Sequence, residues 1–291
     1  DKIDINQFAG KKGTGTEHMI VLMVDRILWL LDQPGKSAVF SAAVDWADAF
    51  SRTDPTITVQ KMIRIGIRPS LVSVLIEFLQ DRTMSLKFNQ EESPLFDLIG
   101  GGPQGSWAGQ NSYIISSDDN AEFVTQEDRY KYCDDLSVLE LVMLGHLLVE
   151  YDFHNHVASD VAIGQLFLPT GNTATQTNLN LVADWSVQNL TKINKSKTNY
   201  IVFTRARAPF STRLTLNEKV LERKSFIKLL GVWLQEDGRW DKNIAETCKS
   251  AYQRVSMLTK LRYAGETIEN LIHILQAVYK KQTGILYGGH A

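Results

Sequence analysis

Apolar side chains recur at helical spacing in several stretches of the chain. Ile20, Val24, Ile27 and Leu31 are separated by four, three and four residues, so an amphipathic helix is expected from Glu17 to Asp32. Other helices are indicated by a proline in what would be the first helical turn, where proline is tolerated, or by apolar residues with the same three- and four-residue spacing. These further helices are expected at 55–65, 69–80, from 106 onward, at 179–189 and at 244–258.

Short apolar or alternating runs predict strands between these helices. Ser37 to Val44 is an apolar run of strand length that ends directly before Asp45. Two neighbouring runs, 130–133 and 136–142, predict a hairpin with Asp134 and Asp135 at its tip. Other strands are expected at 84–89, at 199–204, around Leu214 and at 229–234. Strands and helices mixed in this order predict an α+β fold with a helical C-terminal appendage.

Composition narrows the class of protein. The chain has 291 residues, is 44% hydrophobic and 22% charged, and has a mean hydropathy of -0.16, which fits one large globular domain or two smaller ones. Disordered, collagenous and disulfide-rich classes are excluded. Every long apolar stretch carries charges, so no membrane span is expected. Cys133 and Cys248 lack the number and spacing of a disulfide framework or zinc site, which favours a reducing compartment.

The sequence opens at Asp1 without an initiator Met or a leader, so we expect a piece of a longer polypeptide. An intracellular location is expected, nuclear or cytoplasmic, with no localisation signal visible.

Charge is distributed unevenly along the chain. Residues 1–190 hold 13 Lys and Arg against 25 Asp and Glu, a balance of -12, whereas residues 191–262 hold 16 against 6, a balance of +10. A basic stretch after an acidic body is typical of a polyanion bound beside a cation site, although a solvated helical face has the same pattern.

Four short motifs could carry chemistry, and each is weak alone. The adjacent carboxylates of Asp134 and Asp135 repel each other unless a cation lies between them or one takes a proton, yet an Asp-Asp pair is also common in turns. Asp45 ends a strand. The glycine loop 100–105 allows close backbone approach to a ligand, and the segment 193–198 could bring an ammonium group near a phosphate.

Together, in this order, these motifs resemble the reverse transcriptase domain of non-LTR (LINE-like) retrotransposons. The resemblance runs from Gln7-Phe8-Ala9-Gly10-Lys11-Lys12-Gly13 to Leu230-Gly231-Val232-Trp233-Leu234, which resembles a primer-grip strand. It implies a right-hand polymerase palm, an antiparallel sheet packed on helices. The implied domains are partial fingers at 1–36, palm with part of the fingers at 37–235, and the start of a helical thumb at 236–291.

The resemblance also implies roles for single residues. Asp45 and Asp134 would coordinate two Mg²⁺ ions, with Mn²⁺ as a substitute, and Asp135 would complete the acidic cluster. Lys197 matches a lysine that faces the pyrophosphate as a candidate general acid. Phe50 matches a bulky residue beneath the deoxyribose, which favours DNA as the product. Nucleotide-binding roles are implied for Trp46, Phe50, Gln104, Gly105, Lys11 and Lys12, and primer or template contacts for Gly102, Pro103, Leu230, Gly231 and Lys260.

The implied function is RNA-directed DNA polymerisation, with an RNA template, a DNA primer and dNTPs as partners. Upstream fingers and an endonuclease would belong to the rest of the polypeptide. Ser51 and Thr14 depart from the family pattern, and an insertion near 144–173, with His146, His154 and His156, has no counterpart there. Two alternatives therefore stay open: a catalytically decayed copy that still binds nucleic acid, and an RNA-templated RNA polymerase, against which Phe50 counts.

Overall fold

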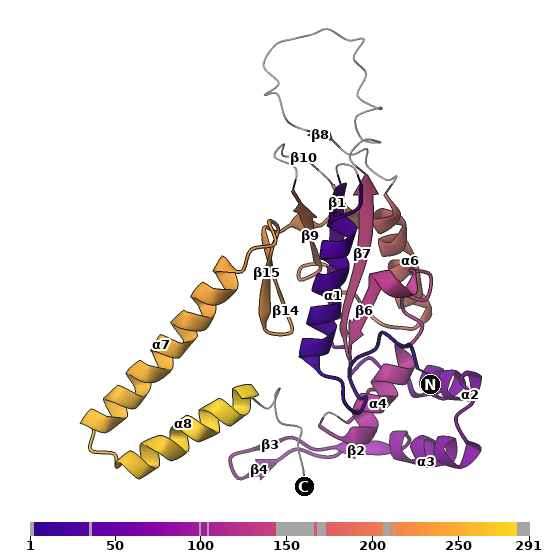
Figure 1. Cartoon of the computed structure of the whole chain (residues 1–291). Helices are drawn as coiled ribbons and strands as arrows, with labels where there is room; N and C mark the ends of the chain where they lie inside the picture. The colour runs from indigo at the N-terminus through magenta and orange to yellow at the C-terminus, as the bar shows by residue number, and fades with distance from the viewer. Residues whose placement is uncertain are drawn as a thin grey trace, which may run out of the picture.

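A five-stranded sheet forms the centre of the molecule (Figure 1). The structure is a computed structural model that describes residues 3–34, 37–98, 100–103, 105–143, 166–167, 173–205, 210–211 and 213–283. The strand order is β13-β9-β1-β7-β6, and all pairings are antiparallel except that β13 runs parallel to β9. The strands are β1 (Ser37–Val44), β6 (Arg129–Tyr132), β7 (Asp135–Met143), β9 (Asn199–Thr204) and β13 (Glu222–Arg223).

β1 is central because its residues are apolar or small on both sides. Ala38, Phe40 and Ala42 belong to one hydrophobic core, whereas Val39 belongs to the other. Seven of its eight residues are buried, the pattern of a strand covered on both faces.

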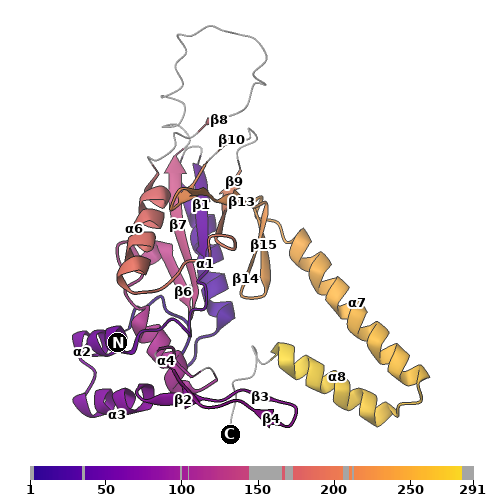
Figure 2. The ribbon, with the colours of Figure 1, turned by 180° about the vertical axis from the view of Figure 1, so that it is seen from behind.

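Helices cover the two faces of the sheet (Figures 1 and 2). α1 (Thr16–Leu31) buries Met19, Met23 and Ile27 against one face. Of the predicted stripe, Ile20 and Ile27 are buried, and Val24 and Leu31 are partly buried against the same core. α6 (Ala174–Gln188) buries Leu179 and Val182 against the other. The predicted α+β fold, an antiparallel sheet with packed helices, is confirmed at this level.

A smaller helical layer packs beside the sheet. It consists of α2 (Pro55–Arg64), α3 (Pro69–Leu79) and α4 (Trp107–Ser116), with a core at Met62, Val72 and Ile115. α2 begins where Asp54 accepts a hydrogen bond from the Ile57 N–H at 2.9 Å. A ribbon of four short strands joins α3 to α4: β2 (Arg82–Met84), β3 (Lys87–Phe88), β4 (Glu91–Glu92) and β5 (Phe96–Leu98).

The C-terminal part is a hairpin followed by two helices. The hairpin pairs β14 (Phe226–Leu229) with β15 (Val232–Gln235), and α7 (Asp241–Tyr263) and α8 (Ile268–Thr283) follow it. The first turn of α7 is anchored where the Trp233 N–H donates to Asn243 Oδ1 at 3.1 Å. α7 has no buried residue and projects away from the sheet (Figure 1).

The remaining elements are short. They are η1 (Gln126–Asp128), β8 (Leu166–Phe167), β10 (Phe210–Ser211), β11 (Thr215–Leu216) and β12 (Lys219–Val220). Within the described ranges, no helix combines the length and apolar character that crossing a bilayer requires.

Two sequence predictions about strands were wrong. The run 84–89 is not one strand, because β2 ends at Met84 and β3 begins only at Lys87. The run 229–234 is not one strand either, because Leu230 and Gly231 form the turn between β14 and β15 with φ of 48° and 90°. Of the expected insertion at 144–173, only residues 166, 167 and 173 lie among the described residues, and its three histidines lie outside them.

Candidate active site

Asp45 and Asp135 come from adjacent strands of the sheet. The register of β1 and β7 places Val44 opposite Leu136, so the next position along each strand brings Asp45 opposite Asp135. Both carboxylates therefore lie at one end of the sheet, beside the turn between β6 and β7. The turn between β14 and β15 lies toward the same end (Figure 1).

Asp134 belongs to a two-residue turn. Tyr132 pairs with Asp135, so Cys133 and Asp134 alone connect the two strands, and Asp135 is the first residue of β7 rather than part of the tip. Cys133 has a φ of 56°, the left-handed conformation that tight hairpin turns require. The Cys133 N–H donates a hydrogen bond to Gln7 Oε1 at 3.0 Å.

The three carboxylates interact electrostatically. Burial raises the pKa of Asp135 to about 6, and the charges of Asp134 and Asp45 act in the same direction. Burial also raises the pKa of Asp45, where Lys197 opposes the effect and Asp134 adds to it. At both carboxylates the charge of Asp134 adds to the effect of burial, and a cation bound here would stabilise the ionised forms.

A tightly connected loop carries Lys197 to Asp45. The Asn194 N–H donates to the Asp45 carbonyl at 2.7 Å, and the Asp45 N–H donates to Thr198 Oγ1 at 3.2 Å. Trp46 and Ile193 form an isolated antiparallel bridge next to these bonds. The backbone of the segment 193–198 is therefore fixed to the end of β1, which explains the influence of Lys197 on Asp45.

The glycine loop is tied to the segment that follows β1. The Gly102 N–H donates to the Phe50 carbonyl at 3.0 Å, and the Gly101 N–H donates to the Thr53 carbonyl at 2.8 Å. The Phe50 ring lies 5.0 Å from the ring of Tyr113. Burial raises the pKa of Tyr113 well above its usual value, and the charge of Asp134 is the next cause. Phe50 therefore packs on a residue that interacts electrostatically with the acidic cluster.

Other residues expected at the site lie in different surroundings. Trp46 is buried against Trp185, with ring centroids 5.4 Å apart. The Lys11 ammonium donates to the carbonyls of Asp4 and Ile5 at 2.7 and 3.1 Å. Lys12 is exposed, Lys260 is exposed on α7, and Leu230 and Gly231 form the β14–β15 turn. Pro103 and Gly105 flank Gln104, which lies outside the described residues.

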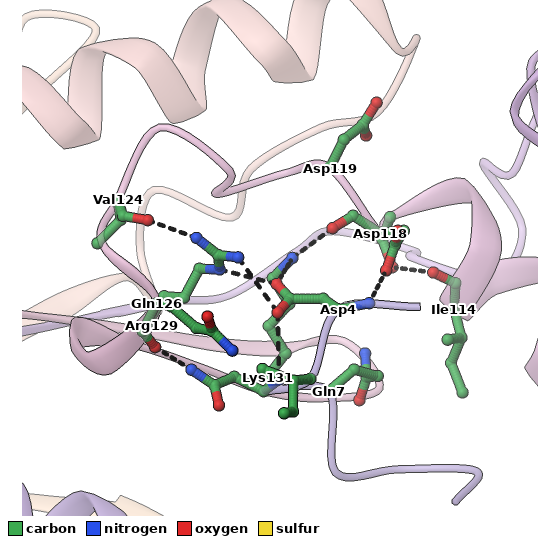
Figure 3. Close-up of polar contacts among 12 residues, drawn as sticks. Asp4, Gln7, Ile114, Asp118, Asp119, Val124, Gln126, Arg129 and Lys131 are labelled. Atoms are coloured by element: carbon green, nitrogen blue, oxygen red, sulfur yellow. Dashed lines mark hydrogen bonds and ion pairs between the residues drawn. The ribbon is translucent and has the colours of Figure 1, made fainter. Parts of the chain in front are cut away.

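Sequence reasoning missed a buried charge network behind the turn. The Asp4 carboxylate lies between Arg129 and Lys131 at 2.8 and 2.9 Å, and the Asp4 N–H donates to Asp118 at 2.8 Å (Figure 3). The signal was the alternation of charged and aromatic residues in Arg129 to Tyr132. A lysine in a strand needs a partner when its side chain is 1% exposed, as Lys131 is.

A second missed cluster connects α2 to α6. Asp119 accepts from Lys61, Arg64 and the indole N–H of Trp185 at 2.6, 2.6 and 2.9 Å. The Lys61 ammonium also lies 4.7 Å from the centre of the Trp185 ring. Because Trp185 packs on Trp46, this cluster supports the backbone next to Asp45.

The donor atoms fit a hard divalent cation in their chemistry, since Mg²⁺ prefers carboxylate oxygens and the repulsion among the three carboxylates favours a cation. Within the ranges that the structure covers, no three His, Cys, Asp or Glu side chains form a ready-made metal cage. In the described residues the acidic cluster thus lies at the ends of β1 and β7 and in the turn before β7, and it does not form a closed site.

In its sequence, this chain is similar to a transposon RNA-directed DNA polymerase. This relative is the probable RNA-directed DNA polymerase from transposon BS of Drosophila melanogaster, 23% identical over 261 residues that make up 87% of this chain and 26% of the relative. The resemblance to a reverse transcriptase domain is therefore confirmed. The chain spans about a quarter of the length of that relative.

No family model matches the chain. A solved structure of apo telomerase from Candida tropicalis, truncated from the C-terminal domain, is 10% identical, with a TM-score of 0.46 over 76% of this chain and 38% of that one.

Proposed function

We propose that this chain is the reverse transcriptase domain of a non-LTR retrotransposon, which extends a DNA 3′-end on an RNA template with dNTPs. The observation that carries the proposal is the cluster of Asp45, Asp134 and Asp135 at adjacent strand ends, with Lys197 close enough to affect the pKa of Asp45. The transposon polymerase relative supports the same reaction class.

In this proposal Asp45 and Asp134 hold two Mg²⁺ ions, or Mn²⁺ as a substitute, and Asp135 completes the negative environment. Bound there, the ions supply Lewis acidity for the primer 3′-hydroxyl and charge stabilisation for the leaving pyrophosphate. Burial is the main cause of the raised pKa values of Asp45 and Asp135, and the charge of Asp134 adds to both. The assignment is supported because a cation bound there would stabilise the ionised carboxylates.

The chain's own residues would orient the reactants. Lys197 would place its ammonium group near the pyrophosphate and donate a proton there. Phe50, fixed by Tyr113 on one side and by the glycine loop on the other, would block space that a ribose 2′-hydroxyl needs. The nucleotide would also contact Gln104, Gly105, Trp46 and the fingers lysines Lys11 and Lys12, of which Lys12 is the freer because Lys11 donates to two carbonyls.

Nucleic acid would be held on the basic part of the chain. The excess of positive charge in 191–262 supports backbone contacts with a polyanion. Gly102, Pro103, Leu230, Gly231 and Lys260 are the proposed contacts with primer and template. The proposed division is partial fingers at 1–36, palm at 37–235 and thumb at 236–291, with the upstream fingers and an endonuclease supplied by other parts of the polypeptide.

Primer extension on an RNA template with a DNA primer, dNTPs and Mg²⁺ or Mn²⁺ tests the proposal. The wild-type chain should extend the primer, and Asp134→Ala should abolish extension while binding the duplex as well or better, because a carboxylate that repels phosphate is removed. Asp25→Ala is the matched control, because Asp25 is an exposed carboxylate on α1.

Three results would contradict parts of the proposal. Extension by Asp134→Ala refutes the ligand assignment. Preferential use of rNTPs by the wild-type chain favours the RNA polymerase alternative. A folded wild-type chain that binds the duplex without extending it favours the decayed copy.

A further inference from the structure

Gln7 lies against the turn that carries Asp134. Its side chain is buried, the residue being 1% exposed, and its Oε1 atom accepts hydrogen bonds from the N–H groups of Ala9 at 3.1 Å and Cys133 at 3.0 Å. Cys133 is the first of the two turn residues and directly precedes Asp134. One side-chain oxygen therefore holds the backbone next to a proposed metal ligand.

The turn needs such support for two reasons. Cys133 has a φ of 56°, a left-handed conformation that is unfavourable for a residue with a Cβ atom. The adjacent carboxylates of Asp134 and Asp135 also repel each other at the turn, and this repulsion favours an opened turn. A hydrogen bond to the Cys133 N–H opposes both tendencies because it fixes the peptide orientation at the entrance of the turn.

The backbone around Gln7 holds its side chain in place. The Lys131 N–H donates to the Asn6 carbonyl at 2.9 Å, and the Phe8 N–H donates to the Lys131 carbonyl at 2.9 Å. Gln7 and Lys131 thus form a parallel bridge beside β6. Asp4 anchors the same segment through its ion pairs with Arg129 and Lys131. The position of Oε1 is therefore determined by the strand that leads into the turn.

We infer that Gln7 is a positioning residue that fixes the Cys133–Asp134 turn, and through it the carboxylates of Asp134 and Asp135, in the arrangement that holds divalent cations. The inference rests on the proposed function of the acidic cluster. Gln7 contacts no reacting atom and acts only through the Cys133 amide. Its loss should weaken cation binding and turnover more than it weakens the fold.

The chain offers a matched control at Gln176, which has a comparable structural role elsewhere. Gln176 is 5% exposed, its Oε1 accepts from the Thr215 N–H at 2.8 Å, and its Nε2 donates to the Thr215 carbonyl at 2.9 Å. These bonds join α6 to β11. Gln→Met at either position removes the acceptor and keeps a side chain of similar volume.

The experiment compares the wild-type chain, Gln7→Met and Gln176→Met in four measurements: thermal unfolding, hydrogen exchange of the Cys133 amide, Mn²⁺ affinity by electron paramagnetic resonance, and primer extension. Both variants should lower Tm. Only Gln7→Met should lose protection of the Cys133 amide, bind Mn²⁺ more weakly and lose roughly 10- to 100-fold in kcat, the scale of a misplacement of about 1 Å. The KM for dNTP should change less than kcat.

Equal Mn²⁺ affinity and kcat in the two variants would overturn the inference and leave Gln7 with a structural role only. If Gln7→Met does not fold, Gln7→Glu replaces it, because glutamate keeps an oxygen acceptor. The Cys133 amide should then be protected from hydrogen exchange in both Gln7→Glu and the wild-type chain. Exchange of this amide at the rate of a free peptide in either chain would overturn the inference. A wild-type chain that binds Mn²⁺ without extending primers refutes only the polymerase proposal. The positioning role of Gln7 is still tested in that case, by comparing the Mn²⁺ affinity of Gln7→Met with that of the wild-type chain.

Discussion

Replacing Asp4 by Asn should destabilise the chain at neutral pH and remove part of its sensitivity to acid. The Asp4 side chain is 5% exposed, and burial by itself would raise its pKa. Arg129 and Lys131 more than offset burial and lower the pKa from 3.8 to about 2. At about 1.4 kcal/mol per pKa unit, the ionised carboxylate contributes about 2.5 kcal/mol to the free energy of unfolding.

The sign of the pH dependence follows from the lowered pKa. A carboxylate with a depressed folded-state pKa contributes fully above its unfolded value and loses this contribution as pH falls through the folded value. For Asp4 the window runs from about pH 4 down to about pH 2. The cost of Asp4→Asn at pH 7 should be larger, about 3–5 kcal/mol, because the buried Lys131 ammonium loses its carboxylate partner.

Urea unfolding at pH 7, 5, 4 and 3, followed by circular dichroism, measures both effects. Asp128→Asn is the control, because its ion pair with Arg26 at 2.9 Å is more exposed and should contribute about 1 kcal/mol or less. The stability difference between wild type and Asp4→Asn should be constant from pH 7 to 5 and narrow below pH 4. The reasoning would be refuted if Asp4→Asn lowered the free energy of unfolding at pH 7 by no more than Asp128→Asn does. It would also be refuted if the stability difference between wild type and Asp4→Asn did not narrow below pH 4.

Two further substitutions test the nucleotide side of the site. Phe50→Val should raise the kcat/KM for rNTPs relative to dNTPs, because it removes the ring that occupies the 2′-hydroxyl space; unchanged selectivity would rule out the steric role. Gly109→Ala should lower Tm and raise the KM for dNTP, because its Cβ would lie 2.2 Å from the Pro103 carbonyl oxygen and displace the glycine loop. Gly238→Ala is the control, since its φ of +72° adds strain of about 1–2 kcal/mol but its Cβ meets nothing within 4 Å, and an equal effect of both variants on the KM for dNTP would contradict the displacement.

The sequence predicted the central strands well for a physical reason. β1 and β9 are covered on both faces, so nearly every position is apolar and the run is continuous, and both strands have the predicted bounds. Asp45 lies directly after β1 and Asp134 lies in the turn before β7, as predicted, whereas Asp135, also expected at the tip, is the first residue of β7. Their meeting at one end of the sheet is a consequence of the antiparallel register.

The remaining features of the fold and the site depend on contacts between residues far apart in the sequence, which a local sequence pattern does not reveal. Asp4 and Arg129 are 125 positions apart, and neither is unusual in its own neighbourhood. Leu230 adopts a left-handed conformation within an apolar run, so the sequence favoured a continuous strand where tertiary packing instead forms a turn. The short strands between 82 and 98 are defined by pairing with each other rather than by periodicity.

The short parallel bridge beside β6 has a consequence for solubility. An antiparallel sheet leaves two outer strands whose backbone groups can recruit strands from other molecules. At one edge Asn6 and Phe8 occupy the outward N–H and C=O groups of Lys131, and at the other β13 is only two residues long. The same N-terminal segment that braces the turn therefore also protects the sheet against edge-to-edge aggregation.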